Sequence, residues 1–295
     1  MYLKNLARLC GLGMGILSLI SCKKDDNNSK ANLRLTISGL EDLGSNARYE
    51  GWIMVNGSPV STGIFTVNSS GTLSQTSFEV DKAALTAATA FVLTVEPFPD
   101  NSAAPSEQKL MGGDFNGSNA SASINHAAAF NQNFSSAIGK YILATPTTTS
   151  TTDELSGVWF IDNSSGSPMA GLSLPALPAG WKYEGWALIN GKPVSTGVIT
   201  SASSADSFSG YSGTAGTPPF PGEDFIMNAP AGLSFPADLS GGLAVISVEP
   251  FPDNSPHPFL LKPLVGNIPA SPMQHFVYNM NVNSGSFPSG TITKN

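Results

Sequence analysis

Cysteine is almost absent from this sequence, and the two that occur, Cys10 and Cys22, both lie near the N-terminus. The chain after Cys22 therefore contains no disulfide, no cysteine-ligated zinc and no cysteine nucleophile. Histidine is nearly as scarce, and His126, His257 and His275 have no His or Cys neighbour at ligand spacing. We expect no metal site and no cofactor.

Charged residues are also few, at 12% of the chain. The 14 Lys and Arg against 21 Asp and Glu give a formal net charge of -7, which provides no positive field for a phosphate backbone. We therefore expect no nucleic acid partner. Glycine (30) and proline (22) are abundant, and this composition is typical of short strands joined by many turns.

No stretch of the sequence has the roughly eighteen apolar residues that a membrane-spanning helix needs. The apolar run at residues 9–20 follows Lys4 and Arg8, and this order is typical of a signal peptide, which we assign to residues 1–21. The run ends in Leu-Ile-Ser-Cys, which resembles the lipobox at which bacterial lipoproteins are cleaved and acylated. The resemblance implies a palmitate-type lipid on Cys22, and the alternative is a secretory peptide with an incidental cysteine.

The residues after Cys22 also concern localisation. Residues 23–26, Lys-Lys-Asp-Asp, resemble the surface-export tag of Bacteroidetes lipoproteins, and residues 22–31 form a polar tether. Together these features predict a protein anchored by lipid in the outer membrane and exposed at the cell surface. The alternative orientation faces the periplasm.

An internal duplication organises the rest of the chain. The segments YEGWIMVNGSPVSTGIFT from Tyr49 and YEGWALINGKPVSTGVIT from Tyr183 are identical at twelve of eighteen positions, and VEPFPDNS occurs unchanged from Val95 and from Val248. The second copy has 19 more residues between its motifs, which we assign to a long loop at 201–224. Residues 145–152 consist of Thr and Ser with one Pro, and they are predicted to link a first domain, 32–144, to a second, 153–295.

The local patterns are those of strands. Asn-Gly at 56–57 and at 190–191 lies between apolar runs and predicts two tight hairpins. The runs 91–95 and 244–248 suit buried strands, and further strands are expected at 33–38, 140–144, 158–162, 276–281 and 291–294. Asp81 is placed to cap a short helix over 81–88. We predict an all-β fold of two tandem antiparallel β-sandwiches, each of which folds independently.

The motif order in both copies resembles the extracytoplasmic C-terminal domain of anti-sigma-K factors. The residues that give this resemblance are Tyr49, Trp52, Pro59, Val60, Ser61, Gly63, Glu96 and Pro97, with Tyr183, Trp186, Pro193, Val194, Ser195, Gly197, Glu249 and Pro250 in the second copy. Anti-sigma factors of that kind have a cytoplasmic sigma-binding region and a membrane helix before this domain, and neither occurs here. The resemblance therefore implies an extracytoplasmic module with no direct sigma-factor binding.

Few side chains of this sequence point to catalysis. Glu96 and Glu249 end buried strands and are expected to accept hydrogen bonds there, although paired acids can also perform general acid and base chemistry. Ser61 and Ser195 have no recurring His or Lys beside them, and no G-x-S-x-G motif is present. We predict that the protein is not an enzyme and has no catalytic residues.

The tryptophans have two interpretations. Trp52 and Trp186 are expected in the core, with a sugar-stacking platform as the alternative, whereas Trp181 beside Gly180 is expected to be exposed to ligands. The leading hypothesis is a non-enzymatic envelope lipoprotein that binds a protein or glycan partner. The alternatives are a sensor of an anti-sigma/sigma system that acts through a separate transmembrane partner, and an envelope hydrolase that uses Glu96 or Glu249.

Overall fold

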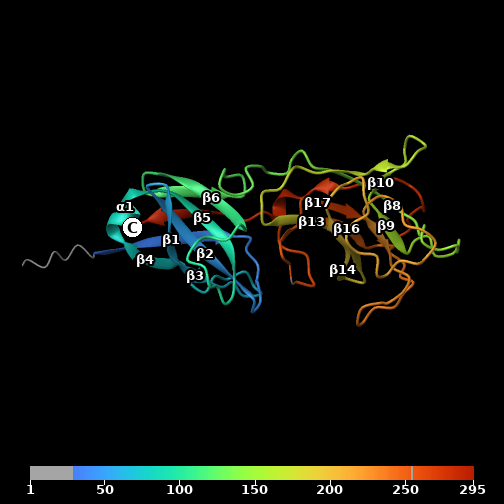
Figure 1. Ribbon diagram of the computed structural model, residues 1–295, viewed down its shortest axis with the longest axis horizontal. Helices are drawn as coiled ribbons and strands as arrows, with labels where there is room; N and C mark the ends of the chain where they lie inside the picture. Colours follow the sequence, from blue (N-terminus) through green and yellow to red (C-terminus); the bar gives the residue numbers. More distant parts are fainter. Residues whose placement is uncertain (1–28, 254) are drawn as a thin grey trace, which may run out of the picture.

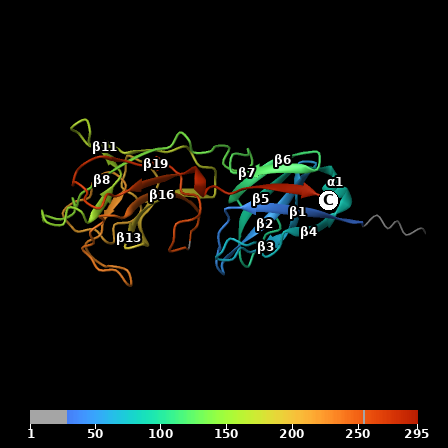
Figure 2. The same ribbon diagram turned by 180° about the vertical axis from the view of Figure 1, so that it is seen from behind.

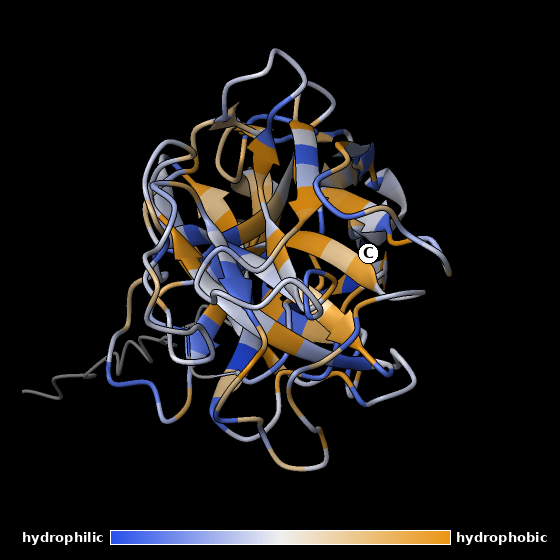
Figure 3. Cartoon of the chain, turned by 90° about the vertical axis from the view of Figure 1, so that its right-hand side faces the viewer, coloured by the Kyte–Doolittle hydropathy of each residue, from blue (hydrophilic) through white to orange (hydrophobic). Residues whose placement is uncertain are grey.

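The computed structural model describes residues 29–253 and 255–295. Cys22, which is predicted to carry the lipid, the predicted signal peptide and most of the predicted tether lie outside these ranges. The chain forms two lobes of antiparallel strands (Figure 1), and the predicted all-β architecture is confirmed. Hydrophobic residues recur along the strands, and many of the surrounding loops are more hydrophilic (Figure 3). Within the described residues no helix has the length and apolar character needed to cross a membrane.

The first unit is a single eight-stranded sheet in the order β3-β2-β5-β6-β7-β20-β1-β4. Its edge strands β3 and β4 contact each other, so the sheet curls around its own core. Its elements are β1 (Lys30–Ser38), β2 (Ala47–Val55), β3 (Ser58–Phe65), β4 (Ser77–Asp81), α1 (Lys82–Ala87), β5 (Ala88–Pro97), β6 (Lys109–Asn116), β7 (Asn119–Ser123) and β20 (Ser289–Lys294).

The second unit has two five-stranded sheets and a short two-stranded one. The first of these sheets has the order β14-β13-β16-β17-β19, and β8 joins β12, β9 and β18 in the other. Its strands are β8 (Ile138–Leu143), β9 (Gly157–Trp159), β10 (Ile161–Asp162), β11 (Met169–Ala170), β12 (Leu172–Ser173), β13 (Trp181–Ile189), β14 (Lys192–Ile199), β15 (Gly222–Asp224), β16 (Leu243–Pro250), β17 (Leu264–Asn267), β18 (Tyr278–Asn279) and β19 (Asn281–Val282); the short helix η1 (Ser284–Ser286) follows.

Local sequence signals correspond to these elements. Asn56 and Gly57 have φ angles of 51° and 78° in the β2–β3 turn, and Asn190 and Gly191 have 52° and 77° in the β13–β14 turn, as a tight hairpin requires. The Asp81 side chain accepts a hydrogen bond of 2.8 Å from the Ala84 backbone N–H at the start of α1. The predicted hairpins and the predicted helix cap are both confirmed.

The units exchange their last strands. β20, at the end of the second sequence repeat, lies in the first unit between β1 and β7 (Figure 2). β8, at the end of the first repeat, lies in the second unit beside β9. The sheets therefore differ from the predicted division into 32–144 and 153–295 at these two strands. Two segments, 124–137 and 283–288, cross between the units.

The Thr-rich segment 145–152 is not a free tether. Thr145 and Thr147 are buried, and the Thr147 backbone N–H donates a hydrogen bond of 2.9 Å to the buried Asp224 carboxylate. The Thr147 hydroxyl donates to the same oxygen. Hydrogen bonds from Thr147 thus attach this polar segment to the second unit.

Candidate functional site at the junction of the two units

A chain of three buried polar side chains lies on the sheet of the first unit. The Trp52 indole N–H of β2 donates a hydrogen bond of 2.9 Å to the Thr94 hydroxyl of β5. The Thr94 hydroxyl in turn donates to the Glu96 carboxylate, which also accepts 2.9 Å from the Ser106 backbone N–H. Glu96 is 2% exposed, so its carboxyl group accepts hydrogen bonds from these donors rather than from water.

The second unit repeats this chain with one hydroxyl changed. The Trp186 indole N–H donates to the Ser247 hydroxyl at 2.8 Å, and Ser247 donates to Glu249. The Phe259 backbone N–H donates to both carboxylate oxygens, at 2.9 and 3.0 Å. Burial raises the pKa of Glu249 to about 8. Both glutamates are therefore buried hydrogen-bond acceptors, as their positions at strand ends predict.

The tryptophans are buried, but not in the main core. Trp52 and Trp186 are 3% and 2% exposed and lie outside the main hydrophobic cluster, on the sheet face that holds the polar chains. Neither has a ring free for a sugar. The prediction for Trp181 was wrong, because this residue lies on β13, is 3% exposed and packs between Phe130 and Phe259.

The serines of the PVSTG motifs contact acids rather than bases. Ser61 of β3 donates its hydroxyl proton to Glu50, and Ser195 of β14 donates to Glu184. Burial raises the pKa of both carboxyls. These glutamates belong to the repeated YEGW segment, but the sequence does not show that they face the serines, because the pairing depends on the hairpin register.

The remaining motif residues shape the hairpins. Both β2–β3 and β13–β14 contain a register shift, after Gly51 and after Gly185. Gly63 and Gly197 lie opposite these positions with φ angles of 125° and 129°, where a side chain is strained. The other motif residues lie on the same strands: Tyr49 on β2, Pro59 on β3, Tyr183 on β13 and Pro193 on β14.

The two VEPFPDNS copies meet at one cavity, although they lie 153 residues apart in the sequence. This cavity, which we call the junction cleft, has a volume of about 590 Å³. The first unit lines it with Glu41, Asp42, Leu43, Gly44, Ser45, Asn46, Ala47, Val95, Glu96, Pro97 and Gln108, and the second with Glu249, Pro250, Pro252, Asp253, Ser255, Pro256, His257 and Phe259.

The junction cleft is lined by several acidic residues, and the two units contact each other beside it. Gln108 of the first unit donates a hydrogen bond of 2.8 Å from its side chain to the Phe251 carbonyl of the second. Burial raises the pKa of Glu41 to about 7, against the opposing effect of Lys262 from the other unit. The close approach of Gly180 to Glu107 leaves no room for a Cβ atom. These contacts fix the two motif copies relative to each other.

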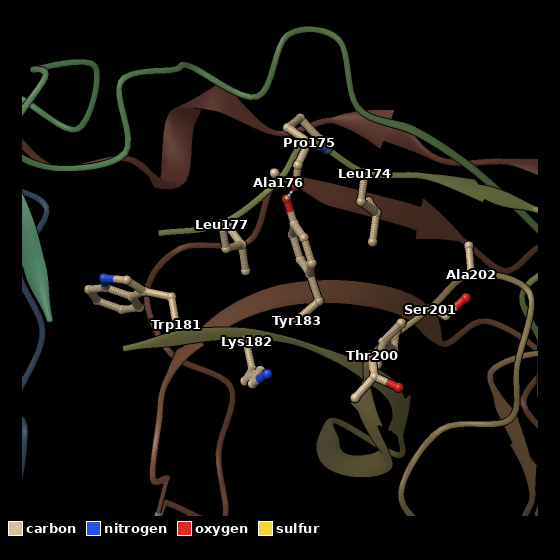
Figure 4. A pocket seen from close by; sticks show the side chains of 11 residues that line it. Leu174, Pro175, Ala176, Leu177, Trp181, Lys182, Tyr183, Thr200, Ser201 and Ala202 are labelled. Carbon is tan, nitrogen blue, oxygen red and sulfur yellow. Dashed lines mark hydrogen bonds between the residues drawn. The ribbon is translucent and has the colours of Figure 1, made fainter. Parts of the chain in front are cut away.

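A second cavity, of about 330 Å³, lies within the second unit (Figure 4). Leu174, Leu177 and Tyr183 line it, and the Tyr183 hydroxyl donates 2.7 Å to the Pro175 carbonyl at its edge. The first unit has the same tyrosine contact, from the Tyr49 hydroxyl to the Glu41 carbonyl at 3.1 Å. This recurrence marks a feature of the repeat that anchors the loop before each YEGW strand.

Three further acids lie where the 201–224 loop meets the second unit; Glu223 and Asp224 are fully buried and Asp206 is half-buried. Asp206 accepts 2.9 Å from the Gly222 backbone N–H, the Ser212 hydroxyl donates to Glu223, and Asp224 accepts 2.7 Å from the Trp159 indole. Burial raises the pKa of Asp206 to about 7 and that of Glu223 to about 8. Within residues 29–253 and 255–295, no group of three or more His, Cys, Asp or Glu has the arrangement to hold a metal ion.

Residues 26–110 match a family model described as anti-sigma-K factor rskA, C-terminal. The resemblance to that domain is confirmed. The match covers the YEGW, PVSTG and VEPFPDNS motifs of the first copy, and the second copy shares these motifs through the duplication. Searches of curated proteins and of solved structures gave no match.

Proposed function

We propose that this protein is a non-enzymatic, lipid-anchored envelope protein that binds a protein or glycan partner at the junction cleft. One observation supports the site above others: both VEPFPDNS copies line a single cavity. The cleft is large enough for a peptide segment or a few sugar units, and its lining combines prolines with carboxylates and amides.

The environment of the two motif glutamates supports binding or stability rather than catalysis. Glu96 and Glu249 are both buried and accept hydrogen bonds from a hydroxyl and a backbone N–H. Such acids are satisfied before any substrate arrives. The hydrolase alternative predicts activity on a panel of glycans and esters that disappears in Glu96→Gln and Glu249→Gln; no activity above background in the wild type supports the binding proposal.

Site-specific photocrosslinking tests the cleft in living cells. A benzoylphenylalanine at Ser45, which is exposed and lines the junction cleft, should give a discrete adduct with an envelope protein or polysaccharide. The matched control places the same photoprobe at the exposed Ser70, in the turn after β3. Equal labelling at the two positions, or none at Ser45, contradicts the cleft as the binding site.

The lipid anchor is proposed from the sequence around Cys22. Metabolic labelling with palmitate should mark the wild type and not Cys22→Ser, and continued labelling of the variant contradicts the anchor. The Lys-Lys-Asp-Asp segment after Cys22 supports surface exposure, so protease added to intact cells should digest the protein. Full protection places it on the periplasmic side.

The family match favours a second candidate, a sensor of an anti-sigma/sigma system that acts through a separate transmembrane partner. Deletion of the gene should then change the transcripts of one sigma regulon, and reintroduction of the protein should restore them. An unchanged transcriptome under envelope stress contradicts the sensor role.

A further inference from the structure

The slots of β8 and β20 are equivalent. β20 pairs with β1 so that Leu33 faces Lys294, and β8 pairs with β9 so that Val158 faces Leu143. Leu143 of β8 is therefore equivalent to Lys294 of β20, a difference of 151 in residue number. With the same difference, Gly139 is equivalent to Gly290 and Tyr141 to Ile292. Both Tyr141 and Ile292 are fully buried. Two different sequences thus fill the same position in two copies of one sheet.

β20 has modest side-chain anchoring in the first unit. Ile292 is its one large apolar residue with no exposure, whereas Ser289 and Thr291 are exposed. Thr293 donates a hydrogen bond of 3.0 Å to Asn119 of β7, and Lys294 donates 2.6 Å to the Ala88 carbonyl. The Lys294 Nζ atom also lies 4.1 Å from the centroid of the Phe115 ring of β6. Backbone pairing with β1 and β7 adds to these side-chain contacts.

All these contacts belong to the first unit, yet the chain reaches β20 from the second unit through residues 283–288. A β20 strand from another molecule would make the same contacts, because in this slot β1, β7 and Ala88 contact only residues of β20 itself. We propose that the slot between β1 and β7 is a strand-acceptor site for a second copy of this chain, which inserts its own β20 in reciprocal exchange.

Protein concentration decides between the monomer, whose slot holds its own β20, and the dimer with exchanged β20 strands. A short connection gives the chain's own β20 an effective concentration of about millimolar at its slot. Exchange between molecules replaces one set of contacts by an identical set, so the dimer gains population when chains refold together at comparable concentration, as in other strand and domain exchanges.

Cysteine pairs report the exchange, because Asn119 and Thr293 face each other across β7 and β20. Both chains carry Cys10→Ser and Cys22→Ser; one also carries Asn119→Cys and the other Thr293→Cys. After refolding as a mixture at high concentration and mild oxidation, we expect a disulfide-linked dimer that contains one chain of each kind. The peptide map should show the 119–293 link.

The matched control replaces Thr293→Cys by Ser289→Cys, which is exposed on the same strand. Four residues place it about 13 Å further along β20, beyond disulfide reach of position 119. We expect at least tenfold less linked dimer from this mixture. Equal yields from the two mixtures, or no linked dimer from either, overturn the proposal.

Discussion

The Thr94 hydroxyl joins Trp52 to Glu96, and its removal tests whether this buried chain stabilises the first unit. Thr94→Val keeps the shape of the side chain but removes an acceptor from the indole N–H and a donor from the carboxylate. A buried polar group left without a partner costs about 1 to 3 kcal/mol, and Glu96 keeps its bond from Ser106. We expect the free energy of unfolding to fall by about 2 to 4 kcal/mol.

The protein supplies its own control for this substitution. The second unit has Ser247 at the position of Thr94, with the same two contacts. Thr94→Ser should therefore keep the chain and lose only a methyl group, at a cost of about 1 kcal/mol. Urea unfolding of the full chain followed by tryptophan fluorescence measures both variants. A similar loss of unfolding free energy in Thr94→Val and Thr94→Ser, or no loss in Thr94→Val, refutes the reasoning.

Three further predictions concern other parts of the fold. Gly197→Ala should lower the unfolding free energy by more than about 1 kcal/mol, because its added Cβ would meet the Asp206 carboxylate at 2.7 Å. In the control Gly191→Ala the added Cβ meets nothing within 4 Å, so only the strain of the positive φ remains. Ile292→Ala should cost about 2 to 5 kcal/mol in thermal or urea unfolding, and a cost below 1 kcal/mol would contradict the anchoring role of β20. Burial raises the pKa of Glu223 from 4.5 to about 8, so between these pH values the folded chain keeps a proton that the unfolded chain loses. The free energy of unfolding should therefore fall as pH rises from about 4.5 to 8. Glu223→Gln should flatten this decline, and an unchanged pH profile would show that the group does not titrate as described.

Signals that act within a few residues predicted local structure well. The Asn56 hairpin, its counterpart at Asn190 and the Asp81 cap depend on backbone angles and on one neighbouring N–H, so the residues themselves specify them. The burial of Glu96 and Glu249 followed from their places at the ends of apolar strands in the same way. The duplication then extended each inference to the second copy.

Features that depend on long-range pairing were out of reach. β8 and β20 have equivalent places in the repeat and fit the same slot, so their sequences do not state which unit each one joins. The junction cleft depends on how the units dock, and therefore on contacts such as the one from Gln108 to Phe251. Trp181 was misjudged for the same reason, because Phe130, which covers it, comes from the crossing segment 124–137.

Cleavage of the Thr-rich segment tests most directly whether, within one chain, β8 lies in the second unit and β20 in the first. A protease site inserted between Ser150 and Thr151, both exposed, cuts the chain between the two sequence repeats. Because β8 and β20 each remain in the sheet of the opposite unit, the two fragments should stay together after cutting and elute in gel filtration at the size of the intact chain. Fragments that separate in native buffer into two folded halves would contradict the exchange and restore the simple tandem arrangement.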